Sequence, residues 1–170
     1  MHILAGRFKG RTIRTFKKAP YRPTQARVRK SLFDILPDLD DALVLDLYAG
    51  TGIIGFEAAS RGAKQVVFVE QNPHAVQLIR QNCNLFTGVD FSIEPTDACK
   101  YLQHCGQFDF IFADPPYAEG AFNSLIDLSL ERLNIGGYFV LETARSATNF
   151  TGDRIKLYGD TKLTIWRKKP

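Results

Sequence analysis

Three glycines in the first third of the chain have a spacing that suits a nucleotide-containing ligand. Gly50, Gly52 and Gly55 match a GxGxxG pattern, which allows a tight strand-to-helix turn with no side chains where a ligand lies against the backbone. A nicotinamide dinucleotide, a flavin dinucleotide and S-adenosylmethionine would all fit such a turn. Asp46 distinguishes these candidate ligands, because a carboxylate just before the turn repels a pyrophosphate but attracts the sulfonium and ammonium charges of S-adenosylmethionine. The segment therefore favours S-adenosylmethionine.

A second motif, Asp114-Pro115-Pro116-Tyr117, directly follows a later apolar run. In an open parallel sheet, ligands bind in the crevice outside the carboxyl ends of the strands. We therefore expect Asp46 and Asp114 to be delivered to one crevice.

The elements that position these motifs alternate along the chain after residue 38, as is typical of βαβ units in a parallel sheet. We expect strands at 43–47, 65–69, 91–94, 108–113 and 138–141 and a closing hairpin of 155–158 with 162–166. The expected helices are at about 52–61, 73–86, 98–105 and 122–132. Before residue 38, the pattern predicts a short hairpin of 3–5 with 11–13, a linker at 17–23, and a helix from Thr24 to Leu36.

Basic residues are concentrated at the N-terminus. Residues 1–36 contain ten Lys and Arg and one acid, so they carry +9, whereas the remainder carries −5 and the whole chain +4. A local basic block on an acidic body indicates a polyanion partner, although a merely solvated arm is the alternative. We therefore expect residues 1–37 to form a basic extension that contacts nucleic acid and residues 38–170 to form the catalytic domain that binds S-adenosylmethionine.

Composition excludes several other classes. A chain of 170 residues with 45% hydrophobic content suits one folded core, and no run approaches the roughly 20 apolar residues of a membrane span. The start of the chain lacks a signal-peptide pattern, so we expect a cytoplasmic protein. The three cysteines have neither metal-site nor disulfide-framework spacing, and we expect reduced thiols and no metal.

The motifs together resemble the amino-methyltransferase branch of the class I Rossmann-like methyltransferases. Over nearly its whole length the chain also resembles the RsmD family, bacterial enzymes that methylate a guanine at N2 in 16S ribosomal RNA. Segments 3–10, 22–33 and 158–163 support this resemblance, in order with the glycine loop and the Asp-Pro-Pro-Tyr motif. It implies an α/β fold: a seven-stranded, mostly parallel sheet with an antiparallel last strand and helices on both faces.

The resemblance also implies the roles of individual residues. Glu70 would accept hydrogen bonds from both ribose hydroxyls, and Asp97 from the adenine amino group unless it only caps a helix. The implied cofactor contacts are Asp46, Tyr48, Ala49, Gly50, Gly52, Glu70, Gln71, Asp97, Ala98 and Asp114. The implied catalytic residues are Asp114, Pro115, Pro116 and Tyr117. The expected RNA contacts are Arg7, Lys9, Arg11, Arg22, Thr24, Arg27 and Arg29. Glu142 ends a strand, and we expect a structural role for it.

The expected mechanism follows from the poor nucleophilicity of a guanine amino group. Its lone pair is delocalised, so the site must hold it in line with the methyl group and accept hydrogen bonds from its protons. Asp114 and the Pro115 carbonyl are the expected acceptors, because two prolines stiffen the loop and remove a competing amide hydrogen. Tyr117 would stack on a base that has left its own stack. The expected partner is ribosomal RNA or an assembling small subunit, acted on by a monomer.

The same residues support three rival functions less well. A DNA adenine-N6 methyltransferase would use the same motif, but no segment remains for a DNA-recognition domain. A protein glutamine-N5 methyltransferase typically has Asn at the position of Asp114 and an added helical domain. A C5-pyrimidine methyltransferase needs a nucleophilic cysteine, and none lies in either loop.

Overall fold

The computed structural model describes residues 1–16, 26–116, 122–147 and 150–170. The strands in these ranges are β1 (Leu43–Leu47), β2 (Gln65–Val69), β3 (Asp90–Glu94), β4 (Phe108–Ala113), β5 (Leu133–Ala144), β6 (Arg154–Tyr158) and β7 (Thr161–Arg167). The helices are α1 (Ala26–Ile35), α2 (Ile53–Ser60), α3 (Pro73–Cys83), α4 (Ala98–Leu102) and α5 (Phe122–Glu131).

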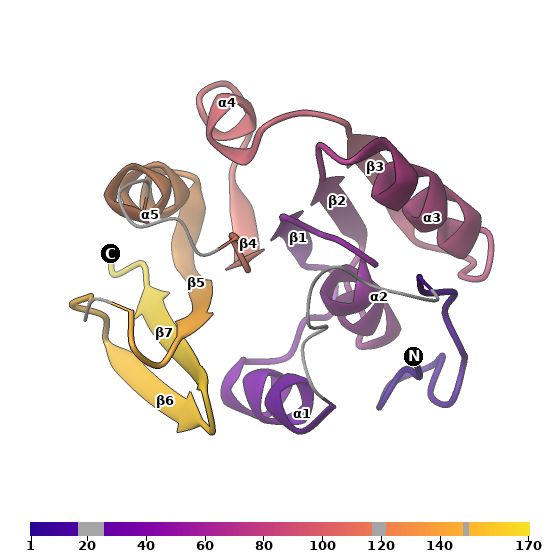
Figure 1. The fold of residues 1–170 in the computed structure, drawn as a ribbon, viewed down its shortest axis with the longest axis horizontal. Coiled ribbons are helices and arrows are strands. Elements are labelled where there is room, and N and C mark those ends of the chain that lie inside the picture. Colours follow the sequence, from indigo (N-terminus) through magenta and orange to yellow (C-terminus); the bar gives the residue numbers. More distant parts are fainter. Residues whose placement is uncertain (17–25, 117–121, 148–149) are drawn as a thin grey trace.

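The strands form one sheet with the order β3-β2-β1-β4-β5-β7-β6. Neighbours are parallel from β3 to β5, whereas β7 is antiparallel to both β5 and β6. β7 alone is therefore reversed among the described strands. This confirms the predicted class I Rossmann-like sheet, with helices on both of its faces (Figure 1).

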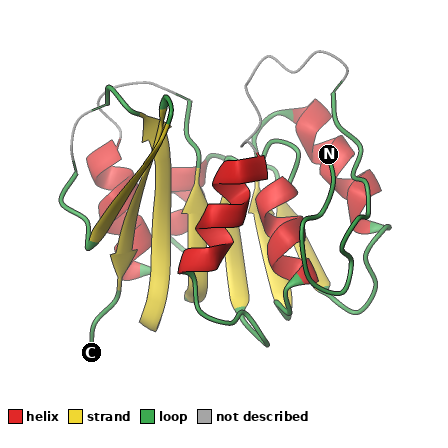
Figure 2. Ribbon diagram, turned by 90° about the horizontal axis from the view of Figure 1, so that it is seen from below, coloured by secondary structure: helices red, strands yellow, loops and turns green. Residues whose placement is uncertain are grey.

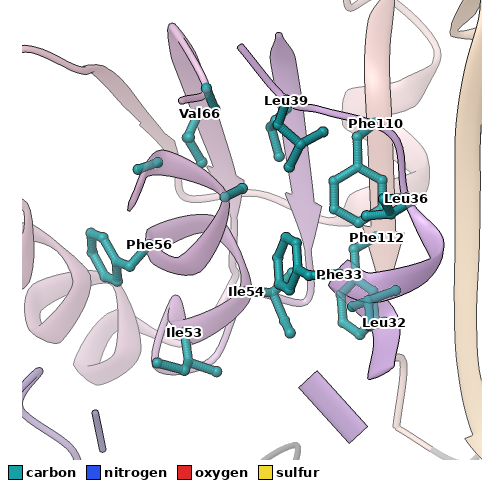
Figure 3. Close-up of a cluster of buried hydrophobic side chains, with 14 of the residues drawn as sticks. Leu32, Phe33, Leu36, Leu39, Ile53, Ile54, Phe56, Val66, Phe110 and Phe112 are labelled. Atoms are coloured by element: carbon teal, nitrogen blue, oxygen red, sulfur yellow. The ribbon is translucent and has the colours of Figure 1, made fainter. Parts of the chain in front are cut away.

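Alternate side chains of the strands fill two apolar layers, because successive residues of a strand point to opposite faces. Val44, Phe110 and Phe112 lie in one cluster with side chains of α1 and α2. Phe33 of α1 makes an edge-on ring contact with Phe110, with centroids 6.2 Å apart (Figure 3). Ile111 and the other side chains on its face of the sheet pack instead with α4 and α5, on the opposite side. Two buried faces explain why these strands read as continuous apolar runs.

Strand β5 is longer than expected, and its predicted start at residue 138 is wrong. It begins at Leu133, which pairs with Phe108, and the register then shifts so that Tyr138 pairs with Phe110. Gly136 and Gly137 lie inside this irregularity rather than before the strand. The expected helix ends at 86 and 105 were also too late, because α3 ends at Cys83 and α4 at Leu102, and turns follow at 84–85 and 103–104.

The predicted N-terminal hairpin is formed only in part. His2 and Thr12 make an isolated antiparallel bridge, and no strand covers 3–5 or 11–13 (Figure 2). The cross-strand backbone bonds end at Ile3, which donates to the Arg11 carbonyl and accepts from the Gly10 amide, each at 2.9 Å. Beyond Ile3 the backbone amides of Leu4 and Ala5 donate instead to the Glu57 carboxylate of α2, at 2.8 and 3.1 Å. Residues 1–16 are thus attached to the helices of residues 38–170 and share their core.

The predicted linker at 17–23 lies outside the described residues. Within the described ranges, no helix combines the length and apolar character that a membrane crossing requires.

Candidate active site

Four carboxylates from four adjacent strands meet at one edge of the sheet. Leu47 of β1 pairs with Val69 of β2 and with Ala113 of β4, and Ala113 pairs with Leu141 of β5. Glu70, Asp114 and Glu142 directly follow these paired residues, and Asp46 lies one position before Leu47. We call Asp46, Glu70, Asp114 and Glu142 the carboxylate row.

The loops after β1 and β4 also meet at this edge, because the two strands are parallel neighbours. The glycine loop and the Asp114-Pro115-Pro116 segment are therefore delivered to one side, as the sequence predicted. Pro115 is buried and Pro116 is exposed. Tyr117, to which we gave a stacking role, lies outside the described residues.

Glu70 holds the glycine loop in its tight form. Its Oε2 accepts from the backbone amide of Gly50 at 2.8 Å, and its Oε1 accepts from the amide of Asn72 at 2.8 Å. The loop needs this support, because Tyr48, a residue with a side chain, has a left-handed φ of 57° beside Gly50 at 55°. Each carboxylate oxygen keeps a second lone pair for an incoming hydroxyl.

Asp46 is buried and lies beside the start of α2. Its Oδ2 accepts from the backbone amide of Gly55 at 2.9 Å. Burial raises the pKa of Asp46 to about 8, with the nearby Glu70 carboxylate acting in the same direction and the Gly55 hydrogen bond against it. Gly55 also lets α2 pack closely on β2, since a Cβ there would lie 2.3 Å from the Phe68 ring.

The surroundings of Asp114 also disfavour its ionised form, as they do for Asp46. Burial, followed by the charges of Glu142 and Asp46, raises the pKa of Asp114 to about 8. Perturbed carboxyl groups that converge at one edge are typical of functional sites. A bound cation would relieve the repulsion and favour the ionised forms of both aspartates.

A second group of side chains borders the glycine loop on the side of α4. Burial raises the pKa of Tyr48 to about 12, with further contributions from Cys99 and Asp97. Asp97 is the N-cap of α4, and its Oδ1 accepts from the Lys100 amide at 2.9 Å. Capping occupies one of its oxygens and leaves the other for a ligand. Ala98, the first residue of α4, is buried.

The remaining predicted cofactor contacts lie in the loops after β1 and β2. Gln71 follows Glu70 at the end of β2 and is exposed. Ala49 donates its amide to the Val69 carbonyl at 3.1 Å, and Gly52 donates to the Ala49 carbonyl at 2.7 Å. These bonds fix the turn between β1 and α2.

A family model described as "Conserved hypothetical protein 95" matches residues 1–167 of the chain. The chain belongs to this family, the RsmD family. YlbH of Bacillus subtilis is 31% identical across 99% of this chain and 100% of YlbH. The Ribosomal RNA small subunit methyltransferase D of Haemophilus influenzae is 31% identical over 77% of this chain and 71% of its own length. The solved structure of Escherichia coli YhhF has a TM-score of 0.86 at 27% identity, covering 99% of this chain and 98% of that chain.

The predicted RNA contacts of this RsmD-family chain divide between two edges of the sheet. Arg27 is exposed at the start of α1, whose other end leads into β1, so it lies toward the carboxylate row. Arg7 lies at the opposite edge, where its guanidinium donates to the Gly88 carbonyl at 3.0 Å just before β3. Arg11 is also remote, over the rings of Phe8 and Phe86.

A cleft of about 520 Å³ lies at this opposite edge, lined by Arg7, Arg61 and Lys64 together with Asp40 and Asp41. Lys9, two residues after Arg7, is exposed. Arg22 and Thr24 lie outside the described residues.

Arg29 corrects the sequence analysis, which expected it to contact RNA. Its side chain is 3% exposed and donates to the His2 carbonyl at 3.0 Å. Leu32 and Phe33, three and four residues later, are both buried, so Arg29 lies on the face of α1 that packs on the protein. The spacing of Arg29 from these two apolar residues could have shown from the sequence that Arg29 is on the buried face.

The sequence analysis did not place Glu142 in the carboxylate row. It was expected to be structural, but it lies next to Asp114 and contributes to its raised pKa. Nothing local in the sequence signals this, because the contact depends on the register between β4 and β5.

Proposed function

We propose that this chain transfers the methyl group of S-adenosylmethionine to the N2 amino group of a guanine in small-subunit ribosomal RNA. The observation that carries the proposal is the shared edge of β1 and β4, where the glycine loop and the Asp114-Pro115-Pro116 loop lie together. The names of RsmD-family relatives, such as the small subunit methyltransferase D of Haemophilus influenzae, support ribosomal RNA as the acceptor.

The donor set of the site suits this cofactor. Two aspartates with raised pKa values fit a ligand that carries positive charge: Asp46 is affected by burial and Glu70, and Asp114 by burial, Glu142 and Asp46. In the proposal, Glu70 uses its remaining lone pairs on the ribose hydroxyls and Asp97 uses its second oxygen on the adenine amino group. The bound cofactor would supply a methyl group on a positively charged sulfur.

Asp114 and the Pro115 carbonyl are proposed to hold the target amine. Each would accept a hydrogen bond from one of its two protons, which fixes the direction of the nitrogen lone pair. Asp114 would then take the proton that the nitrogen must lose. Positioning of this kind supplies much of the acceleration when two bound reactants are held at near-attack distance. Tyr117 would stack on the flipped base.

The RNA would be held through its phosphates by Arg27 near the site and by Arg7, Lys9 and Arg11 at the opposite edge. Arg22 and Thr24, which lie outside the described residues, are proposed as further contacts. Each such cation releases a condensed counterion, so binding should weaken steeply as salt rises. We propose that the protein acts as a monomer.

Transfer of a labelled methyl group to small-subunit ribosomal RNA tests the proposal, followed by mass spectrometry of the nucleosides. N2-methylguanosine is the expected product, and its loss from the ribosomal RNA of cells lacking this protein is the matching result in vivo. The variant Asp114→Ala should abolish transfer while calorimetry shows donor binding nearly unchanged. Full activity of that variant would contradict the catalytic assignment. Labelling of duplex DNA adenine or of a glutamine peptide, with no product in RNA, would replace the proposal with one of its rivals.

A further inference from the structure

The N-terminal segment lies beside α3 and the loop that follows it (Figure 1). Three of its arginines contact that region with their side chains, and we call them the arginine line: Arg7, Arg11 and Arg14. Their contacts move from residue 88 through 86 to 81 while the segment advances from 7 to 14. The two segments therefore run in opposite directions, and the three guanidinium groups follow one another along the surface. All three arginines are exposed.

Two members of the line are held over one aromatic ring. The guanidinium carbons of Arg7 and Arg11 lie 4.7 and 4.9 Å from the centroid of the Phe8 ring. Arg11 also lies over Phe86, at 5.8 Å. Phe8 and Phe86 are 9% and 5% exposed, so the surface here consists of guanidinium groups above a buried apolar base. Side chains that are already restricted lose less entropy when they bind a ligand.

The third member, Arg14, is fixed through its backbone. The side chain of Asn82, which is fully buried in α3, accepts from the Arg14 amide at 2.9 Å and donates to the Arg14 carbonyl at 3.1 Å. The Arg14 guanidinium donates to the side-chain oxygen of Gln81 at 3.0 Å. The position of this cation is therefore set by α3.

Neither segment that forms this surface contains a carboxylate. Residues 1–33 and 71–89 have no Asp or Glu, and they add the exposed cations Lys9 and Arg80. Within the described ranges, no carboxylate forms an ion pair with the arginine line. Asp40 and Asp41 approach it only at one end, in the cleft that Arg7 also lines. A bound polyanion would relieve the repulsion among these cations.

We propose that the arginine line is a second RNA-binding surface, which holds the phosphates of a double-stranded segment distinct from the nucleotide in the active site. The inference takes its partner from the proposed function and rests on it. Guanidinium groups fit phosphate oxygens in pairs of hydrogen bonds, and duplex RNA is contacted mainly along its backbone. Single-stranded RNA would instead need aromatic rings free to stack on bases, but Phe8 and Phe86 lie beneath the arginines. An acidic protein segment fits less well, because protein interfaces have an apolar core.

This surface is separate from the active site. Gly88, the partner of Arg7, precedes the start of β3, whereas the carboxylate row lies where the neighbouring strands end. The five residues of β3 alone span about 16 Å, so a nucleotide at the carboxylate row does not itself reach Arg7. Loss of the arginine line should therefore weaken RNA binding without changing the chemistry.

Fluorescence anisotropy with a blunt RNA duplex of about 20 base pairs tests the surface, because paired bases do not enter the active site. Arg11→Gln combined with Arg14→Gln should raise Kd about tenfold or more and reduce the slope of log K against log salt by about 2. The matched control is Arg154→Gln with Lys156→Gln, which removes two exposed cations from β6 at the other end of the sheet and should leave the slope unchanged. Arg11→Lys with Arg14→Lys keeps the charges and should keep the slope.

Urea unfolding checks that the variants fold. If the double Gln variant does not, Arg14→Gln alone, which retains the backbone bonds to Asn82, should reduce the slope by about 1. An unchanged Kd and slope in a folded double Gln variant would overturn the proposal. Loss of binding to a polyglutamate peptide with duplex binding intact would overturn it as well, because the surface would then take an acidic protein segment.

Methyl transfer to small-subunit ribosomal RNA separates an anchoring role from a catalytic one. The double Gln variant should raise KM several-fold and keep kcat within about twofold of the wild type. A lower kcat with an unchanged KM would refute the anchoring role. If the wild type transferred no methyl group to RNA, the proposed function would fail, and the duplex titration would still decide whether the arginine line binds RNA.

Discussion

The Glu70 carboxylate accepts a hydrogen bond of 2.8 Å from the backbone amide of Gly50, and so joins the end of β2 to the loop after β1. This bond links two functions in one residue, because the oxygens that hold the loop are also the proposed acceptors for the ribose hydroxyls. The loop cannot keep its left-handed residues at low cost without such a partner.

Glu70→Ala should therefore weaken binding of S-adenosylmethionine by more than tenfold. Hydrogen bonds to a charged group each contribute about 1.5–3 kcal/mol, and about 1.4 kcal/mol corresponds to a factor of ten in Kd. Isothermal titration calorimetry measures the loss. The control is Glu94→Gln, at the same edge one strand away, where the carboxylate accepts from the Ser92 hydroxyl at 2.7 Å. Equal affinities of the Glu70 variant and the wild type would remove Glu70 from the cofactor site.

Burial of Asp46 should make the cofactor-free protein less stable as the pH rises. The pKa of Asp46 is 3.8 without burial and about 8 in the folded protein. Between these values the folded state holds a proton that the unfolded state has lost, so the free energy of unfolding decreases with pH. The stabilisation is fully present below about pH 4 and is lost as the pH approaches 8.

Asp46→Asn removes this group and keeps an oxygen that can accept from Gly55. Urea unfolding at pH 5 and pH 8 without cofactor should show a smaller decrease for the variant, by on the order of 1 kcal/mol per pH unit. Some decrease should remain, because Asp114 acts in the same direction. An identical decrease in both proteins would show that Asp46 is ionised throughout.

The parts of the fold that could be predicted from sequence are those decided by local pattern. β1, β2 and β4 begin and end at the expected residues because continuous apolar runs suit strands buried on both faces. The glycine loop and the strand-end acids were located for the same reason, since parallel strands deliver their carboxyl ends to one edge.

The errors involve contacts between residues distant in sequence. The N-terminal hairpin ends at Ile3, and beyond it the backbone amides of Leu4 and Ala5 donate to Glu57, over fifty residues away. Glu142 reaches Asp114 only through the register of β4 with β5, which a shift beside Gly136 and Gly137 sets. No local pattern contains that register.

Substitutions of Gly6 and Gly10 test whether the N-terminal segment is attached to α2, with Gly10 as the control. Both have left-handed backbones, with φ of 78° and 81°. A Cβ on Gly6 would lie 1.8 Å from the Ser60 carbonyl oxygen, whereas a Cβ on Gly10 would have no atom within 4 Å. Gly10→Ala should cost about 1 kcal/mol for its backbone alone, and Gly6→Ala about 1–3 kcal/mol more because of the overlap. Urea unfolding measures both, and equal losses would mean that residues 4–8 are not held against α2.

Arg27 and Arg29, two residues apart on α1, should separate RNA binding from stability. Arg29 is buried against the His2 carbonyl, so Arg29→Ala should lower the free energy of unfolding by about 1–3 kcal/mol. Arg27 is exposed, so Arg27→Ala should change stability by less than about 0.5 kcal/mol.

If Arg27 contacts a phosphate, its loss should weaken RNA binding and reduce the slope of log K against log salt by about 1. Fluorescence anisotropy with a ribosomal RNA fragment at several salt concentrations measures that slope. An unchanged slope for Arg27→Ala would place the RNA away from the start of α1.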